Sequence, residues 1–249
     1  MSARHFVVLT GAGVSADSGV ATFRDAGGLW EGHDVEDVAT PEGWARDPAL
    51  VWRFYQLRRR ALRDVEPNAG HLALATLERE VVAAGGTFLL ITQNVDDLHE
   101  RAGSQHLLHM HGELRRLRCT LCDHEFEDLE QLDLETFVPC PECSERARPA
   151  IVWFGELPLG LDQIESALRT ATDFLAVGTS GEVWPAAGFL AAARAWGART
   201  TVMARERPRN LAAGDHFLEG RSVDTLPAWV REWREASRSL GSGGEPRTP

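Results

Sequence analysis

Residues 6–19 read FVVLTGAGVSADSG, and this stretch decides the fold class. Its first four residues form a short apolar run of strand type. Residues 11–16 (GAGVSA) then fit the pattern G-x-G-x-x-G/A that follows the first strand of dinucleotide-binding sheets. Gly11 permits a tight turn, and Gly13 lets a diphosphate approach the backbone at the start of a helix. Taken alone, the loop is also compatible with a plain structural turn.

Further short strands are indicated by four apolar or β-branched runs. They are residues 88–92 (FLLIT), 107–110 (LLHM), 174–177 (FLAV) and 200–203 (TTVM). Helices are expected between the strands, because proline or an N-cap residue precedes apolar periodic segments and glycine follows some of them. The expected helices span residues 48–64, 71–84, 185–196 and 227–237. Short strands that alternate with helices predict a doubly wound, parallel α/β sheet of the Rossmann type.

The spacing of the strands argues against an ordinary dehydrogenase. In that fold a second strand follows within about thirty residues and carries the acid that binds ribose, but here the second strand begins only at Phe88. Two segments interrupt the alternation, and we expect them to form a smaller lobe: a helical insertion at 25–70 and a cysteine-containing module at 115–148. The nucleotide-binding domain would then consist of residues 1–24, 71–114 and 149–236, followed by a disordered tail at 237–249.

The four cysteines of the chain form two closely spaced pairs. Cys119 and Cys122 make the first C-x-x-C, Cys140 and Cys143 make the second, and residues 123–139 separate them. This spacing is typical of a tetrahedral Cys₄ zinc site. Such a site has no open coordination position, so we expect one structural zinc ion. The segment between the pairs carries many carboxylates, which disfavour phosphate binding by a zinc ribbon: Asp123, Glu125, Glu127, Asp128, Glu130, Asp133 and Glu135.

Composition narrows the possible partners. The 249 residues include 37 acidic and 26 basic side chains, with a net charge of −11. A binder of duplex DNA or of an anionic membrane needs a large basic surface, so neither is expected. Every basic residue is arginine, and no lysine is available as a catalytic amine. The first residues lack the pattern of a signal peptide, and no apolar run approaches the ~18–20 residues that span a bilayer. We therefore predict a soluble, cytoplasmic protein.

Several further strings accompany the glycine loop and the cysteine spacing. They are residues 19–24 (GVATFR), 92–96 (TQNVD), 110–113 (MHGE), 152–156 (VWFGE) and 178–180 (GTS). In this order, over about residues 5–235, the sequence closely resembles the sirtuin family of NAD-dependent protein deacylases. The resemblance implies release of nicotinamide and O-acyl-ADP-ribose. It also implies that acylated lysine side chains of proteins are the partners, with no nucleic acid, no membrane and a monomeric chain.

The resemblance also assigns site residues. NAD would be bound by Gly11, Ala12, Gly13, Phe23, Arg24, Gln93, Asn94, Asp96, Gly178, Thr179 and Ser180. His111 would be the general base, which suits an imidazole whose pKa lies near 6.5. The substrate backbone would pair with the loop that contains Val152, Trp153, Phe154 and Gly155. His109 is the near neighbour of His111, and alternation along a strand places both on the same side. Only the motif selects His111.

The acyl group is indicated by Tyr55 and Arg58. These two residues are three apart and share one helix face. A guanidinium and a phenol there can receive a carboxylate, whereas the neighbouring Arg59 and Arg60 suggest a solvated basic run instead. Helix geometry leaves both readings open. The pair also resembles the sirtuin subclass that removes succinyl, malonyl and glutaryl groups, and the small Ala26 fits that subclass. We expect activity on acidic acyl groups and on acetyl groups.

Three other functions compete with this interpretation. A protein ADP-ribosyltransferase would use the same NAD site. A non-catalytic NAD-binding module would be expected to lack Asn94, Asp96 or His111, all of which are present. A zinc-ribbon protein that binds nucleic acid is disfavoured by the acidic charge. The intact histidine together with the acyl-binding pair favours deacylation.

Overall fold

The computed structural model describes residues 4–21, 29–30, 32–128, 130 and 132–241. Its larger part is built on six parallel strands in the order β11-β10-β9-β1-β4-β5. Their bounds are β1 His5–Thr10, β4 Thr87–Thr92, β5 Leu107–His109, β9 Asp173–Val177, β10 Arg199–Ala204 and β11 His216–Glu219. The five strands expected from the sequence are present, and β11 is added at one edge. The predicted doubly wound parallel sheet is confirmed.

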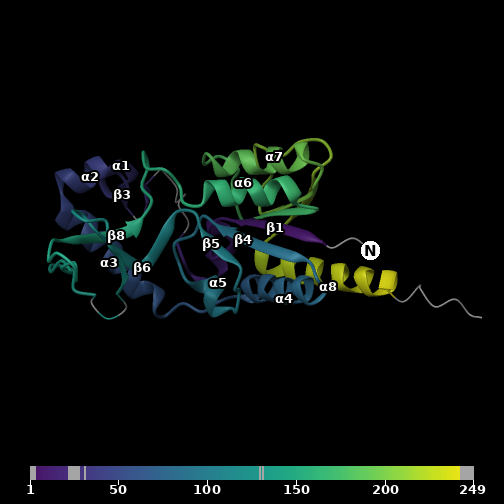
Figure 1. Cartoon of the computed structure of the whole chain (residues 1–249), viewed down its shortest axis with the longest axis horizontal. Helices are drawn as coiled ribbons and strands as arrows, with labels where there is room; N and C mark the ends of the chain where they lie inside the picture. The colour runs from purple at the N-terminus through teal and green to yellow at the C-terminus, as the bar shows by residue number, and fades with distance from the viewer. Residues whose placement is uncertain (1–3, 22–28, 31, 129, 131, 242–249) are drawn as a thin grey trace, which may run out of the picture.

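Helices cover both faces of this sheet (Figure 1). Helices α4 (Ala69–Ala83) and α8 (Ser222–Gly241) pack on one face, and α6 (Leu161–Thr170) and α7 (Phe189–Ala195) pack on the other. The position of β1 inside the sheet explains why its sequence is apolar throughout. Phe6 and Val8 join the core on the α4/α8 side, while Val7 and Leu9 join the core on the α6/α7 side. A strand buried on both faces reads as a continuous apolar run.

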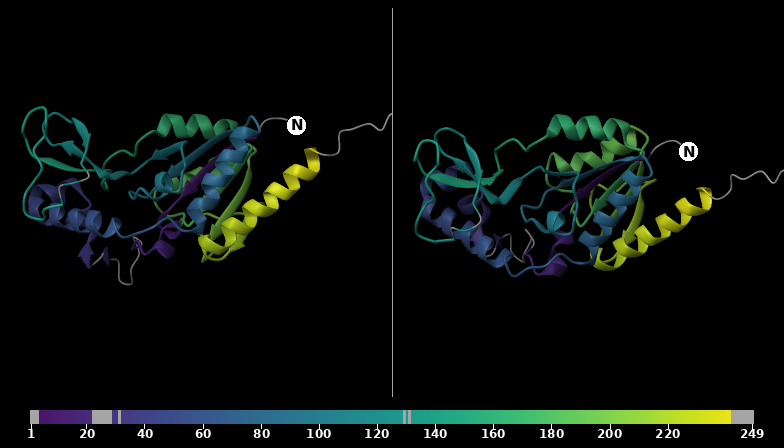
Figure 2. Two further views of the ribbon diagram at one scale, coloured as in Figure 1. Left: turned by 90° about the horizontal axis from the view of Figure 1, so that it is seen from below. Right: turned by 60° about the horizontal axis from the view of Figure 1, so that its bottom comes forward.

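The smaller part lies beside the carboxyl ends of β1 and β4 (Figures 1 and 2). It contains α1 (Val35–Val38), α2 (Pro41–Arg46), α3 (Pro48–Leu62) and a short hairpin of β2 (Leu29–Trp30) and β3 (His33–Asp34). It also contains an antiparallel sheet in the order β7-β6-β8, formed by Glu125–Glu127, Gly112–Cys119 and Ala147–Ile151. The hairpin and this sheet were not expected. The boundaries proposed for the two lobes stay predictions.

Several predicted helix limits differ from the structure. The turn after the glycine loop was expected to open a helix, but it forms two short 3₁₀ turns, Ala12–Val14 and Ala16–Ser18, and Gly19 ends the second at φ +95°. Helix α4 begins earlier than predicted because Asn68 caps it. The segment at 185–196 divides into a 3₁₀ turn at Ala186–Gly188 and helix α7. Helix α6 was not expected from the sequence.

The last helix also differs from its prediction. The sequence predicts Pro227 near its first residue, but α8 begins at Ser222 and contains this proline in its interior. The helix continues to Gly241, so residues 237–241 are helical rather than part of the expected tail. None of the helices in the described part of the chain has an apolar stretch that could span a bilayer.

Candidate active site

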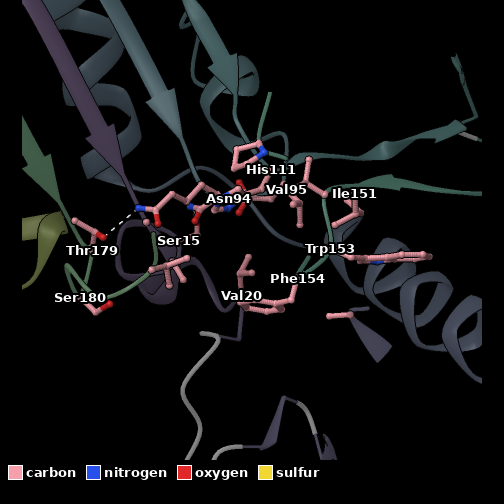
Figure 3. Close-up of a pocket in the computed structure, with 18 of the residues that line it drawn as sticks. Ser15, Val20, Asn94, Val95, His111, Ile151, Trp153, Phe154, Thr179 and Ser180 are labelled. Atoms are coloured by element: carbon pink, nitrogen blue, oxygen red, sulfur yellow. Dashed lines mark hydrogen bonds between the residues drawn. The ribbon is translucent and has the colours of Figure 1, made fainter. Parts of the chain in front are cut away.

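A cavity of about 410 Å³ lies between the carboxyl edge of the sheet and the smaller part of the molecule. Every residue expected to bind NAD, the acyl group or the peptide lines it, as does the expected base, wherever the structure describes that residue; Figure 3 shows part of this lining. These residues are Gly11, Ala12, Gly13, Tyr55, Arg58, Gln93, Asn94, Asp96, His111, Val152, Trp153, Phe154, Gly155, Gly178, Thr179 and Ser180. Phe23, Arg24 and Ala26 lie outside the described residues. The arrangement gathers six separate segments of the chain around one space.

Two glycine loops form the floor of the cavity. The N–H of Gly13 donates to the carbonyl oxygen of Gly178 over 2.9 Å. A Cβ atom added at Gly13 would lie 2.7 Å from that oxygen, and Gly178 has a left-handed φ of +62°. Gln93 Nε2 donates to Thr179 Oγ1 over 3.1 Å, which joins the loop after β4 to the loop after β9 (Figure 3). The order of the sheet reverses between β1 and β9, where parallel α/β sheets bind ligands.

Ser15 connects the glycine loop to Asn94 and was missed as a site residue. Its Oγ accepts from Asn94 Nδ2 over 3.1 Å and lies 3.3 Å from His71 Nε2. His71 Nδ1 accepts the N–H of Asn68 over 3.2 Å, so in the neutral ring Nε2 carries the proton and donates to Ser15. Burial lowers the pKa of His71 to about 4 and keeps the ring neutral. The sequence signal that could have identified Ser15 is its polar side chain inside the glycine loop.

Asp96 is a buried carboxyl group beside this network, with 4% of its surface exposed. Burial raises the pKa of Asp96, and hydrogen bonds from the Leu98 N–H and the Ser15 hydroxyl oppose that rise. The carboxylate oxygen Oδ1 accepts the Leu98 N–H over 3.2 Å. The group therefore faces the cavity in a fixed orientation, where it can accept a hydrogen bond from a ligand hydroxyl or amide.

The two neighbouring histidines are held differently. Met110 and His111 form a turn after β5, so the alternation expected for a strand does not apply to them. His111 Nδ1 lies 3.2 Å from the Gln93 carbonyl oxygen. A carbonyl only accepts, so Nδ1 carries the proton, and the lone pair of the neutral ring is on Nε2. His109 has both nitrogens engaged, with the Asn94 carbonyl oxygen at 3.1 Å and Glu100 Oε1 at 2.6 Å.

These contacts shift the pKa values of the two imidazole rings in opposite directions. Burial lowers the pKa of His111, and the Gln93 carbonyl opposes this only in part. Burial also acts to lower the pKa of His109, but the Glu100 carboxylate, the Asn94 carbonyl and the charge of Glu113 together outweigh it, and the net shift is upward. His111 lines the cavity, whereas His109 is not among the lining residues. The geometry thus separates two histidines that strand periodicity left equivalent.

The acyl-binding pair expected from the sequence lies on the buried face of α3. Tyr55 is fully buried and Arg58 is 9% exposed, and both line the cavity. The alternative, a solvated basic run, is therefore wrong for Arg58. It is also wrong for Arg59, which is buried and pairs with Asp128 at 3.1 Å. Arg60 is exposed and donates to the Leu132 carbonyl. Tyr55 also accepts a hydrogen bond from Trp153 Nε1 over 3.0 Å, which the sequence did not indicate.

The four cysteine sulfur atoms gather at the far end of the β6–β8 sheet. Their Sγ atoms all lie within 4.8 Å of one another, and three pairs are 3.4, 3.6 and 3.7 Å apart. A Zn–S length of ~2.3 Å in a tetrahedron requires sulfur atoms ~3.8 Å apart. All four are free cysteines rather than disulfides. The donor set and its spacing therefore fit a tetrahedral zinc ion.

Comparisons with known proteins agree with this geometry. The family model described as "Sir2 family" matches residues 11–185. The chain belongs to the Sir2 family. A curated relative from Caulobacter vibrioides, named NAD-dependent protein deacylase, is 50% identical over 225 residues, which cover 90% of this chain and 94% of the relative. A relative of the same name from Shewanella oneidensis is 49% identical over 241 residues, covering 96% and 98%.

Solved structures of Sir2 proteins are also similar. A Sir2 homologue in complex with NAD superposes with a TM-score of 0.84 at 37% identity, and the match covers 93% of this chain and 90% of that one. A Sir2 protein bound to acetylated peptide superposes with a TM-score of 0.75 at 25% identity, covering 94% of each chain. The resemblance to the sirtuins is thereby confirmed at the level of the family.

The two histidines of this Sir2 protein should titrate in a defined order. On acidification His109 is expected to protonate at a higher pH than His111, because Glu100 stabilises the imidazolium of His109 while burial disfavours that of His111. Histidine ring NMR signals followed against pH measure both values. Glu100→Gln should lower the pKa of His109 and leave that of His111 nearly unchanged. A reversed order in the unaltered protein would contradict the hydrogen-bond assignment.

Proposed function

We propose that this chain is an NAD-dependent protein lysine deacylase that removes acetyl and acidic acyl groups, including succinyl and malonyl, and releases nicotinamide and O-acyl-ADP-ribose. One observation carries the proposal. The same cavity holds the glycine loops, a histidine with its lone pair on Nε2, and a nearly buried guanidinium beside a phenol. The family assignment and the names of the relatives support the reaction class.

NAD would be held by the loops at the carboxyl edge of the sheet. The close packing of Gly13 on Gly178 leaves bare backbone where a diphosphate can approach, and Thr179 and Ser180 follow directly. Asn94 and Asp96 supply polar groups whose orientation is fixed by Ser15 and Leu98. The bound dinucleotide supplies the ribose that accepts the acyl group and nicotinamide as the leaving group. Phe23 and Arg24 stay predicted members of this site.

His111 would act as the general base. Its Nδ1–H is fixed on the Gln93 carbonyl, so the basic Nε2 is the nitrogen left to take a proton. Burial lowers the pKa of His111, which keeps the ring neutral and able to accept a proton at neutral pH. Val20, Ile151 and Phe154 add apolar side chains to the lining of the same cavity. Exclusion of water protects an activated sugar from hydrolysis.

The acylated lysine would enter beside the loop from Val152 to Gly155, which lines the cavity between the two parts of the molecule. An acidic acyl group would place its carboxylate near Arg58 and Tyr55. Burying a carboxylate among apolar groups is costly unless a charge meets it. The guanidinium supplies that charge and the phenol a hydroxyl donor. Burial raises the pKa of Tyr55, although the positive charge of Arg58 opposes the rise, so the phenol keeps its proton.

Zinc would be held by the four cysteines as a structural ion. A closed set of four thiolates has no position for substrate, and the cluster lies at the opposite end of β8 from the loop that lines the cavity. The ion would fix the two turns that carry the cysteines. These turns have little apolar core of their own, because the nearby buried cluster consists of Trp52, Leu117 and Ala147, which lie outside the turns.

The reaction is tested by incubating the protein with NAD and an acyl-lysine peptide, and by quantifying nicotinamide and O-acyl-ADP-ribose. We expect both products in equal amounts, and His111→Ala should lose most of the activity while it still binds NAD. His109→Ala should lose much less, because its ring does not line the cavity. Transfer of ADP-ribose to the peptide without O-acyl-ADP-ribose would favour the transferase alternative, and equal activity of the two variants would refute the base assignment.

Acyl selectivity is tested by Arg58→Met. A hydrogen bond to a charged group is worth about 1.5–3 kcal/mol, and an unpaired buried carboxylate costs more. We therefore expect kcat/KM for a succinyl-lysine peptide to fall roughly 10–1000-fold, with little change for the matched acetyl-lysine peptide. Arg60→Met is the matched control on the same helix, because Arg60 is exposed and does not line the cavity. Equal losses on both peptides would show that Arg58 is structural and would refute the acidic-acyl assignment.

The metal content provides a separate prediction. Elemental analysis should find one zinc ion per chain. Cys143→Ser should lose the ion and unfold the β6–β8 module, because metal binding to such small sites is worth on the order of 10–16 kcal/mol. Thr120→Ser, in the turn between two of the cysteines, should retain the ion. Folded protein that contains no zinc after purification without chelators would contradict the proposed site.

A further inference from the structure

The hydroxyl group of Tyr55 is contacted by a side chain from another segment of the chain. Trp153 Nε1 donates to Tyr55 Oη over 3.0 Å, and their rings lie 6.4 Å apart at an angle of 32°. Tyr55 is fully buried and Trp153 is 3% exposed, so water does not compete for this hydrogen bond. Both side chains line the cavity in which Arg58 lies. The contact therefore joins helix α3 to the loop after β8 at the acyl-binding end.

Trp153 is itself held by charged groups. The guanidinium carbon of Arg148 lies 3.9 Å above the centre of the indole ring, and Arg148 is 5% exposed. Arg148 Nη2 pairs with Glu156 Oε1 at 2.5 Å, and the other carboxylate oxygen of Glu156 accepts the backbone N–H of Trp153 over 2.9 Å. Arg118 adds a second contact to Glu156 Oε1 at 3.1 Å. These interactions fix both the backbone and the ring of Trp153.

The hydrogen bond has a consequence for the direction of the phenol proton. A phenol O–H lies in the plane of its ring and has two opposite orientations. The indole N–H is a donor only and must point at a lone pair of the oxygen. It therefore excludes the orientation in which the Tyr55 proton points toward Trp153. The remaining orientation points the proton away from the indole.

We propose that Trp153 is a positioning residue for acyl selectivity, because its indole N–H directs the Tyr55 hydroxyl to donate to the carboxylate of an acidic acyl group beside Arg58. This inference rests on the proposed acidic-acyl activity. It adds that the selectivity depends on a residue of the loop after β8 that acts through Tyr55, in addition to the two residues of α3.

The variant that tests this is Trp153→Phe, which keeps an aromatic ring and removes the N–H donor. Loss of one neutral hydrogen bond is expected to lower the ratio of kcat/KM for succinyl-lysine to that for acetyl-lysine by roughly 3- to 10-fold. Trp52→Phe is the matched control. Trp52 is 1% exposed, donates its indole N–H to the Asp133 carbonyl over 3.0 Å and does not line the cavity. It should leave the ratio unchanged.

A double-mutant cycle separates positioning from packing. If Trp153 acts through the hydroxyl group, Trp153→Phe should have no further effect on the ratio when it is added to Tyr55→Phe. The same fall in both backgrounds would overturn the inference. Arg148→Lys is a second variant, useful if Trp153→Phe does not fold. It keeps the charge that pairs with Glu156 but removes the flat guanidinium from the indole, and the ratio should again fall.

The hydrogen bond can also be observed without any acyl substrate. Tyr55 is the only tyrosine in the chain, so protein labelled with ¹³C at tyrosine Cζ has one such NMR signal. Trp153→Phe should shift this signal, and Trp52→Phe should not. Wild-type protein without activity on succinyl-lysine would overturn the proposed acyl class and the inference with it. Wild-type activity combined with an unchanged ratio or an unshifted signal in Trp153→Phe would overturn the inference alone.

Discussion

The close backbone contact between the loops after β1 and β9 is the constraint on which the rest of the site depends. The Gly13 N–H bonds to the Gly178 oxygen, and the ends of β1 and β9 can meet this closely only because neither residue has a Cβ atom. The loop after β4 joins them through Gln93 and Thr179. Three strand ends thus become one rigid floor, and the smaller part of the molecule is placed above it to close the cavity.

Much of the fold follows from local sequence, and the exceptions have physical reasons. Strand β1 could be predicted because burial on both faces requires an unbroken apolar run. Strand β6 could not, because GELRRLRC carries arginines that pair with carboxylates of neighbouring segments, such as Arg118 with Glu156. The sequence places the start of α8 too late because proline favours the first turn of a helix, whereas Pro227 lies inside α8. Long-range ion pairs leave no periodic signal in the sequence.

The site shows the same division. The motifs located His111, but the proton on Nδ1 depends on the Gln93 carbonyl, which only the folded chain brings into place. Helix spacing put Tyr55 and Arg58 on one face, yet whether that face is buried was open until α3 was packed against β6 and β8. The contact between Tyr55 and Trp153 joins residues far apart in the chain and had no local signal. The residue types that the chemistry requires can be read from the sequence. The orientation of their protons and lone pairs cannot, because it depends on contacts that form only in the folded chain.

The smaller part of the molecule is made of two segments that the chain enters and leaves separately. Helices α1 to α3 come before α4 and β4, whereas strands β6 to β8 come after them. The wall that holds Tyr55 and the wall that holds Trp153 thus come from opposite sides of a stretch that belongs to the large sheet. No single contiguous fragment contains both walls without carrying β4 with it. The acyl pocket therefore cannot be moved to another protein as one contiguous segment. Any segment that contains both walls also contains part of the nucleotide-binding sheet.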